Sequence, residues 1–214
     1  MKPRVVLISL SHSDLFEEID MALLHRLSEK ATVQSTKKPD VALDRLREEP
    51  PPAAVLITDA ACTRKYAHVW DAVIAYVRQG GIAIAVGQFS SFVKPNDIGP
   101  FFAKAGLEWA SGAYHRTTVT LKPQAADIAA SGLRAHYSQK AVFLTGVHPD
   151  AVVYGPDENS VTESQVFPTQ TIEDTTQAAI AFAGVGNGKI GYVGDVNHEE
   201  GTNDAILAMC RLAN

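Results

Sequence analysis

The chain has 214 residues, of which 46% are hydrophobic and 20% charged, a composition typical of a globular protein with one sizeable core. Its 24 acidic and 19 basic residues give a formal net charge of −5, which argues against nucleic acid or an anionic membrane surface as a partner. No apolar run is long enough to span a bilayer, no signal-peptide pattern is present, and the two cysteines have no CxxC spacing. We therefore expect one cytoplasmic domain over residues 1–214.

The first half of the sequence alternates between short strand-like runs and longer amphipathic segments. Strands are expected at residues 4–10, 32–35, 53–58 and 82–86. Helices are expected at residues 14–30, from residue 40 to the prolines at 50–52, and at residues 66–78. This alternation predicts a three-layer, doubly wound α/β fold with a mainly parallel sheet of the flavodoxin-like type.

The second half is less regular. A helix is expected at residues 100–107, followed by short strands at residues 117–121, 141–147 and 151–154. The polar stretch at residues 155–174 has no clear period and predicts a long loop. Apolar runs at residues 178–183 and 189–193 flank an Asn-Gly link, which predicts a C-terminal β-hairpin before a final helix that ends at residue 212.

The segment after the run at residues 82–86 should lie at the carboxyl edge of the sheet, where open α/β folds bind their ligands. It reads Gly87-x-Phe89-x-Ser91, whereas a nucleophile elbow would carry Cys or Ser at the third position and Gly at the fifth. Phe89 therefore stands in the expected nucleophile position and cannot attack a substrate. Gln88 and Ser90 in the same segment are candidates for binding a ligand, and a plain strand-ending turn is the alternative interpretation.

Three blocks of sequence carry a family resemblance. They are residues 55–59 (VLITD), 76–87 (YVRQGGIAIAVG) and 179–195 (AIAFAGVGNGKIGYVGD). With these blocks in this order, the chain resembles the class I glutamine amidotransferase-like superfamily, and within it most closely the ThuA-like branch. The resemblance implies a flavodoxin-like fold with a Cys nucleophile on the elbow, activated by a His-x-Glu pair near the C terminus. ThuA-like members share the fold but do not all keep this triad.

The turn before the last predicted helix holds the strongest candidate residues. His198 and Glu200 have the His-x-Glu spacing of the amidotransferase family, and Asp195 lies in the same polar turn. A His oriented by a carboxylate is the base half of a catalytic triad. The alternative is a solvated turn whose acidic residues favour the dipole of the following helix.

Other residues at the same edge are candidate nucleophiles or ligand-binding residues. Cys62, next to two basic residues, and Ser90 are the candidate nucleophiles in place of Phe89, and an inert, half-buried thiol is the alternative for Cys62. Asp59 and His12 follow the third and first predicted strands and are candidate ligand-binding residues. With His198 and Asp195 they could bind a metal, but no metal-ligand spacing supports this, so no metal or cofactor is expected.

These observations favour a divergent amidotransferase-like domain that lacks the Cys nucleophile. We expect it to bind a small polar molecule at the carboxyl edge of the sheet or to act as an assembly module that forms a homodimer. The alternative is a hydrolase that uses Cys62 or Ser90 with His198 and Glu200. A thiol or hydroxyl within hydrogen-bond reach of His198 would favour the hydrolase.

Overall fold

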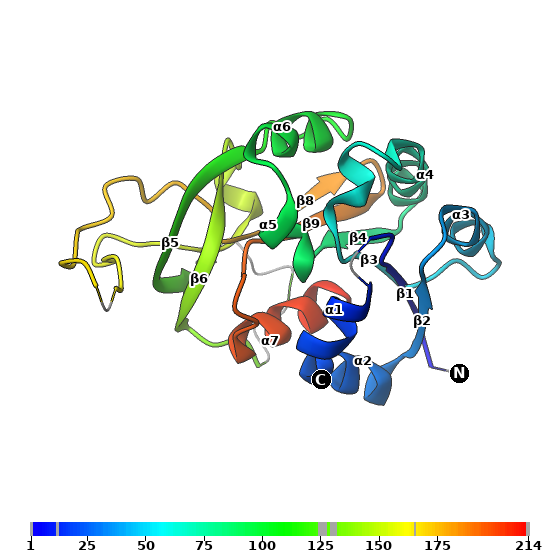
Figure 1. Cartoon of the computed structure of the whole chain (residues 1–214), viewed down its shortest axis with the longest axis horizontal. Coiled ribbons are helices and arrows are strands. Elements are labelled where there is room, and N and C mark those ends of the chain that lie inside the picture. The colour runs from blue at the N-terminus through cyan, green and yellow to red at the C-terminus, as the bar shows by residue number, and fades with distance from the viewer. Residues whose placement is uncertain (1, 12, 124–127, 129–131, 165, 213–214) are drawn as a thin grey trace.

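One mixed sheet of nine strands, in the order β2-β1-β3-β4-β9-β8-β7-β5-β6, forms the centre of the fold (Figure 1). The computed structural model describes residues 2–11, 13–123, 128, 132–164 and 166–212. The parallel half of the sheet consists of β1 (Arg4–Ile8), β2 (Thr32–Thr36), β3 (Ala54–Ile57), β4 (Ile82–Ala85) and β9 (Gly188–Val193). Strands β3 and β4 are buried along their whole length, as their continuous apolar runs predict.

The remaining strands pair antiparallel, so the expectation of a mainly parallel sheet is wrong for this half. These strands are β5 (Ala110–Leu121), β6 (His136–Thr145), β7 (Val152–Gly155) and β8 (Ile180–Val185). A parallel pairing needs a long crossover, usually a helix, and no α-helix joins these strands in the described residues. The predicted C-terminal hairpin is confirmed, because β8 pairs with β9 from Ile180↔Val193 to Val185↔Gly188.

Helices cover both faces of the sheet and produce the three expected layers (Figure 1). One face packs against α1 (Ser13–Ile19), α2 (Met21–Lys30) and α7 (Glu200–Met209). The other packs against α3 (Pro39–Arg47), α4 (Ala67–Arg78) and α6 (Pro95–Ala103). The apolar stripe of each helix is therefore buried against the sheet, which stabilises both the helix and the strands beneath it.

Two helical details differ from the sequence prediction, and both of them shape the candidate site. The helix expected over residues 14–30 is divided, because Asp20 (φ −93°, ψ 23°) separates α1 from α2. The segment expected to be a turn forms the short helix α5 (Gln88–Phe92), which begins directly after Gly87.

Strand β6 forms hydrogen bonds with the turn that follows the C-terminal end of β9. Val142 N donates to Gly194 O at 2.9 Å, and Val196 N donates to Lys140 O at 3.0 Å. Ala141 and Asp195 also form an antiparallel bridge. The antiparallel half of the sheet therefore supports the loop between β9 and α7, in which the candidate residue His198 lies.

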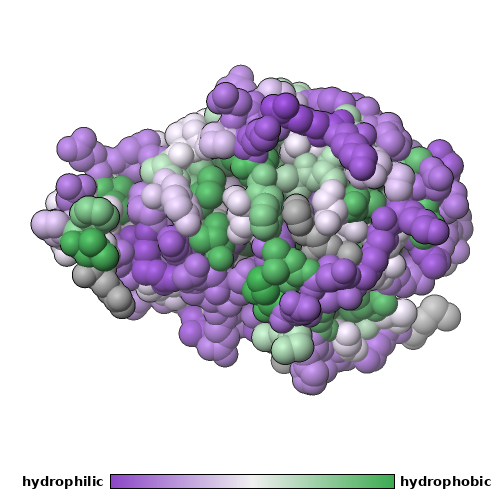
Figure 2. Space-filling view, in the orientation of Figure 1, coloured by the Kyte–Doolittle hydropathy of each residue, from purple (hydrophilic) through white to green (hydrophobic). Residues whose placement is uncertain are grey.

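Gly155 ends β7, and the described residues 156–164 and 166–174 form a long loop, as predicted, with one bridge between Val161 and Thr171. Val166 and Phe167 in this loop are 81% and 73% exposed. Figure 2 shows apolar side chains at the left end of the molecule, where Figure 1 places the loop. No helix within the described residues is long and apolar enough to cross a membrane.

Candidate functional site at the carboxyl edge of the sheet

His198 lies in a tightly held turn between β9 and α7. The buried carboxylate of Asp195 accepts hydrogen bonds from the backbone N–H groups of Asn197 (2.8 Å), His198 (3.0 Å) and Glu199 (2.9 Å). The backbone of His198 is in the left-handed region (φ 61°), which is unfavourable for a residue with a side chain. This conformation persists because Asp195 organises the turn around it.

The imidazole of His198 is oriented by a carboxylate from a distant part of the chain. Its Nδ1 lies 2.8 Å from Asp20 Oδ1, and its Nε2 lies 3.4 Å from Gln88 Nε2. With Nδ1–H donating to Asp20, the neutral ring presents Nε2 as an acceptor toward Gln88. Asp20 is 5% exposed, and its second oxygen, Oδ2, is buried without a hydrogen-bond partner among the described residues.

Opposing effects act on the pKa of His198. Burial lowers it, while the hydrogen bond to Asp20 and the nearby carboxylates of Asp195 and Glu199 raise it, and the net pKa is above the ordinary value of 6.5. The pKa of Glu199 is raised to about 7 by burial and by Asp195, although the Arg116 guanidinium, 2.7 Å from Glu199 Oε1, opposes this shift. The surroundings of the imidazole are therefore rich in carboxylates.

Glu200 does not orient His198, which corrects the His-x-Glu interpretation. Its side chain is 74% exposed and pairs with Arg134 at 2.5 Å on the surface of α7. Asp20 takes the orienting position instead. The sequence contains no local signal for this pairing, because Asp20 is 178 residues away from His198 and lies within a stretch that reads as one continuous helix.

The elbow of the sheet is at Gly87, two residues before the position expected from the sequence. Gly87 has φ 61° and ψ −122° and makes the sharp turn from β4 into α5. A Cβ at this position would lie 2.5 Å from Cε2 of Phe16, whose ring is buried, and 3.4 Å from Asp20 Oδ2. The elbow therefore has no nucleophile, and the ring of Phe16 fills the space that such a side chain would need. Phe89 is a core residue, with its ring centroid 5.1 Å from that of Phe101.

The two candidate nucleophiles are engaged elsewhere. Ser90 Oγ donates to the backbone carbonyl of Asp195 at 2.9 Å and is buried, so it supports the turn. Cys62 lies in a short 3₁₀ helix (Ala60–Thr63) and is 1% exposed, and burial together with Asp59 raises the pKa of its thiol to about 12. Within the described part of the chain, no hydrogen bond joins either side chain to His198.

Asp59 supports the backbone at the ends of β1 and β3. Its carboxylate is 1% exposed and accepts from Ser11 N at 2.7 Å and from Ala61 N at 2.9 Å. His12, the other candidate at this position, lies outside the described residues. Over residues 2–11, 13–123 and the later described ranges, no group of three or more His, Cys, Asp or Glu side chains could hold a metal ion.

A cavity of about 470 Å³ lies beside this cluster. Its lining includes Ser90 and Asn197 but neither His198 nor Gln88. The cavity therefore shares the 195–199 turn with the imidazole site but is distinct from it.

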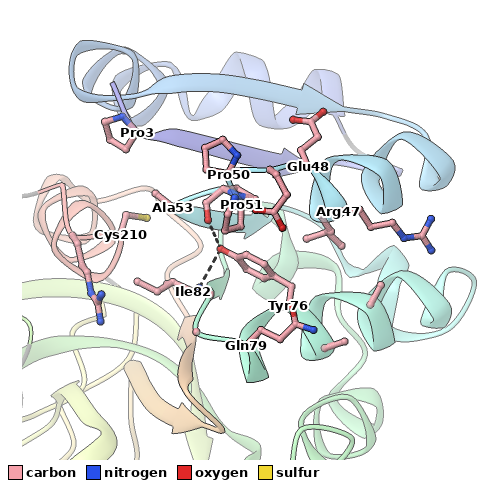
Figure 3. Close-up of a pocket in the computed structure, with 18 of the residues that line it drawn as sticks. Pro3, Arg47, Glu48, Pro50, Pro51, Ala53, Tyr76, Gln79, Ile82 and Cys210 are labelled. Atoms are coloured by element: carbon pink, nitrogen blue, oxygen red, sulfur yellow. Dashed lines mark hydrogen bonds between the residues drawn. The ribbon is translucent and has the colours of Figure 1, made fainter. Parts of the chain in front are cut away.

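A larger cavity of about 970 Å³ lies at the opposite, amino edge of the sheet (Figure 3). Pro3, Ala53 and Ile82, which lie at the starts of three parallel strands, are among its lining residues. Tyr76 bridges the cavity wall, because its hydroxyl donates to Pro52 O at 2.8 Å and accepts from Ile82 N at 3.2 Å. Cys210 lines it as well, but burial raises the pKa of that thiol to about 12.

Comparisons with known proteins identify the fold. No protein-family model matches the sequence, and no curated protein matches it. A ThuA-like protein from Bacteroides uniformis has a similar structure, with a TM-score of 0.67 and 12% identity over 99% of this chain and 91% of that one. A ThuA-like protein from Parabacteroides merdae aligns with a TM-score of 0.53 and 12% identity over 100% of this chain and 90% of that one.

Larger enzymes contain a similar unit. A β-galactosidase from Bacillus circulans sp. alkalophilus aligns with a TM-score of 0.59 and 13% identity over 98% of this chain but only 31% of the enzyme. At these identities the comparisons establish the architecture alone. This chain has the α/β fold seen in ThuA-like proteins.

Proposed function

We propose that this protein is a divergent amidotransferase-like domain that binds a small polar molecule at the carboxyl edge of its sheet without covalent catalysis. The observation that supports the proposal most directly is the absence of a nucleophile at Gly87, the residue at the elbow. Gly87 makes the sharp turn on which a nucleophile would stand, but it has no side chain, and Phe16 occupies the adjacent space. The orienting pair of His198 and Asp20 remains beside it.

The oriented imidazole supports a binding role. A His held in a left-handed backbone conformation, with its ring fixed by a buried carboxylate, is an organised feature of the kind that concentrates at functional sites. Nε2 of His198 and the amide of Gln88 offer an acceptor and a donor side by side, and Asp20 Oδ2 adds a buried acceptor that has no partner in the part of the chain that the structure describes.

The charge of the site favours neutral over anionic ligands. The carboxylates of Asp20, Asp195 and Glu199 all raise the pKa of His198, which means that all three create a negative potential at the ring. An anionic ligand would meet this potential as repulsion. A neutral ligand with both a donor and an acceptor, such as a primary amide, complements the ring and the Gln88 amide.

The test uses L-glutamine and L-glutamate as probes, which differ in one group and in charge. We expect L-glutamine to shift the imidazole NMR resonances of His198 and L-glutamate to shift them less, with no release of ammonia from L-glutamine. Gln88→Ala should weaken the L-glutamine effect, whereas Glu200→Gln, on an exposed side chain that does not contact the imidazole, should not.

Two results would contradict the proposal. Ammonia release that disappears in His198→Gln would establish a hydrolase that uses another nucleophile. Resonances that move for neither probe, with a homodimer in solution, would favour the assembly role instead.

A further inference from the structure

The cavity of about 470 Å³ beside the 195–199 turn has the features of a second, independent ligand site. It opens between α5, the start of α6 and the strands β5 and β6. Figure 2 shows apolar side chains over this part of the molecular face, between the areas where Figure 1 places α5 and the paired strands β5 and β6. Its volume lies within the range typical of small-molecule sites.

The walls of the cavity are predominantly apolar. They are formed by Val93, Pro95, Ile98, Val142 and Val196. The ring of Tyr114, which is 58% exposed, provides a flat aromatic surface at the rim. Aliphatic and aromatic walls of this kind favour a ring-shaped apolar body over an extended polar chain.

Among the described residues, no charged side chain lines the cavity. Two basic groups lie near it, and both are engaged. Arg116 Nη2 lies 2.7 Å from Glu199 Oε1 and 2.6 Å from the side-chain oxygen of Asn197, and Lys140 Nζ lies over the ring of Tyr114, 5.3 Å from its centroid. A charged ligand would therefore lose its hydration without gaining a free counter-charge, whereas a neutral one would not incur this cost.

Two hydroxyl groups in the lining remain available to a ligand. Ser90 and Asn197 already have partners, Asp195 O for the first and Arg116 for the second. Ser91, on α5, and Ser111, on β5, have no hydrogen-bond partner among the residues that the structure describes. Each hydroxyl can donate or accept, so together they can satisfy one small polar group.

We propose that this cavity binds an uncharged, ring-containing small molecule, with the ring packed between Tyr114 and the aliphatic wall and one polar group hydrogen-bonded to Ser91 and Ser111. The site is separate from the imidazole site, since His198 does not line it. The inference therefore goes beyond the proposed function and can fail independently of it.

The test uses three probes of nearly equal shape that differ in charge: benzamide, benzoate and benzamidinium. Titration of the ¹⁵N-labelled protein should shift backbone amide resonances of residues 90–98 and 111–114 with benzamide. Benzoate and benzamidinium should bind at least about tenfold more weakly, because neither finds a counter-charge. Ser91→Ala should weaken benzamide binding by about 2- to 10-fold through loss of one hydrogen bond.

A blocking variant and one control complete the experiment. Ser91→Trp places a large ring at the exposed rim and should abolish the benzamide shifts at residues 90–98 and 111–114. Ser28→Trp, the same substitution at an exposed position on α2, should leave these shifts unchanged. The proposal is overturned by equal binding of the three probes, by no binding up to the solubility of benzamide, or by binding that survives Ser91→Trp.

Discussion

Substitution of Gly87 provides the sharpest test of the structural reasoning about the elbow. In Gly87→Ala the new Cβ would lie 2.5 Å and 2.6 Å from two ring carbons of Phe16, closer than real side chains approach one another. Phe16 is 1% exposed and packed against α2 and the sheet, so its ring has little room to move. We expect this overpacking to cost about 1–3 kcal/mol.

The backbone adds a second cost. Gly87 has φ 61° and ψ −122°, a conformation that glycine adopts freely and alanine does not. This strain should cost about a further 1–3 kcal/mol, so the free energy of unfolding should fall by about 2–6 kcal/mol in total.

Gly106→Ala separates the two contributions. Gly106 also has a positive φ, 85°, but a Cβ there would meet no atom within 4 Å. This variant should therefore show the backbone cost alone. Phe16→Ala combined with Gly87→Ala should be less destabilised than the two single changes predict, because the smaller side chain removes the clash.

The assay is urea unfolding followed by tryptophan fluorescence, with the midpoint compared at unchanged m value. Equal losses in Gly87→Ala and Gly106→Ala, together with simple additivity in the double variant, would refute the claim that Phe16 fills the space at the elbow.

Three further predictions follow from the electrostatics of the described residues. Asp20→Asn should lower the pKa of His198 in an NMR titration, because it removes a carboxylate that raises this pKa, whereas Glu200→Gln should leave it almost unchanged. Because the pKa of His198 is raised by folding, the protonated imidazole stabilises the protein fully below the unfolded pKa of 6.5, and this stabilisation is lost as the pH rises through the folded pKa. His198→Gln should therefore lower the free energy of unfolding more at pH 5.5 than at pH 8.5. A difference of the opposite sign would refute this prediction. The thiols of Cys62 and Cys210, whose pKa values are each raised to about 12 by burial, should resist a thiol reagent at pH 8 in the native protein and react fully in urea; rapid native labelling of either one would contradict their burial.

Local sequence patterns were sufficient to predict much of the parallel half of the fold. The apolar runs that form β1, β3 and β4 and the apolar stripe of α4 are visible in the sequence. Burial of a strand on both faces leaves a continuous apolar run, and burial of a helix on one face leaves apolar residues at the helical period. The Asn-Gly link predicted the β8–β9 hairpin for the same reason, since a tight turn needs particular residues.

The mixed character of the sheet was not predictable in the same way. The runs between residues 110 and 185 have the residue pattern of strands, but this pattern does not distinguish parallel from antiparallel pairing. The direction of pairing depends on the connections between the strands, which carry no periodic signal. The return of β6 to the end of β9, through Ala141 and Asp195, likewise joins segments that are distant in the sequence.

In the candidate site too, local sequence patterns predicted some features and long-range contacts determined the others. The sequence alone identified His198 and the edge of the sheet on which it lies, because a polar turn after an apolar strand is a local feature. Only the tertiary structure decided that Asp20 rather than Glu200 orients the imidazole, and that the elbow residue is Gly87, closed by Phe16. The physical reason is that these contacts depend on a break between two helices and on side-chain packing across the sheet edge, and neither leaves a pattern in the order of the residues.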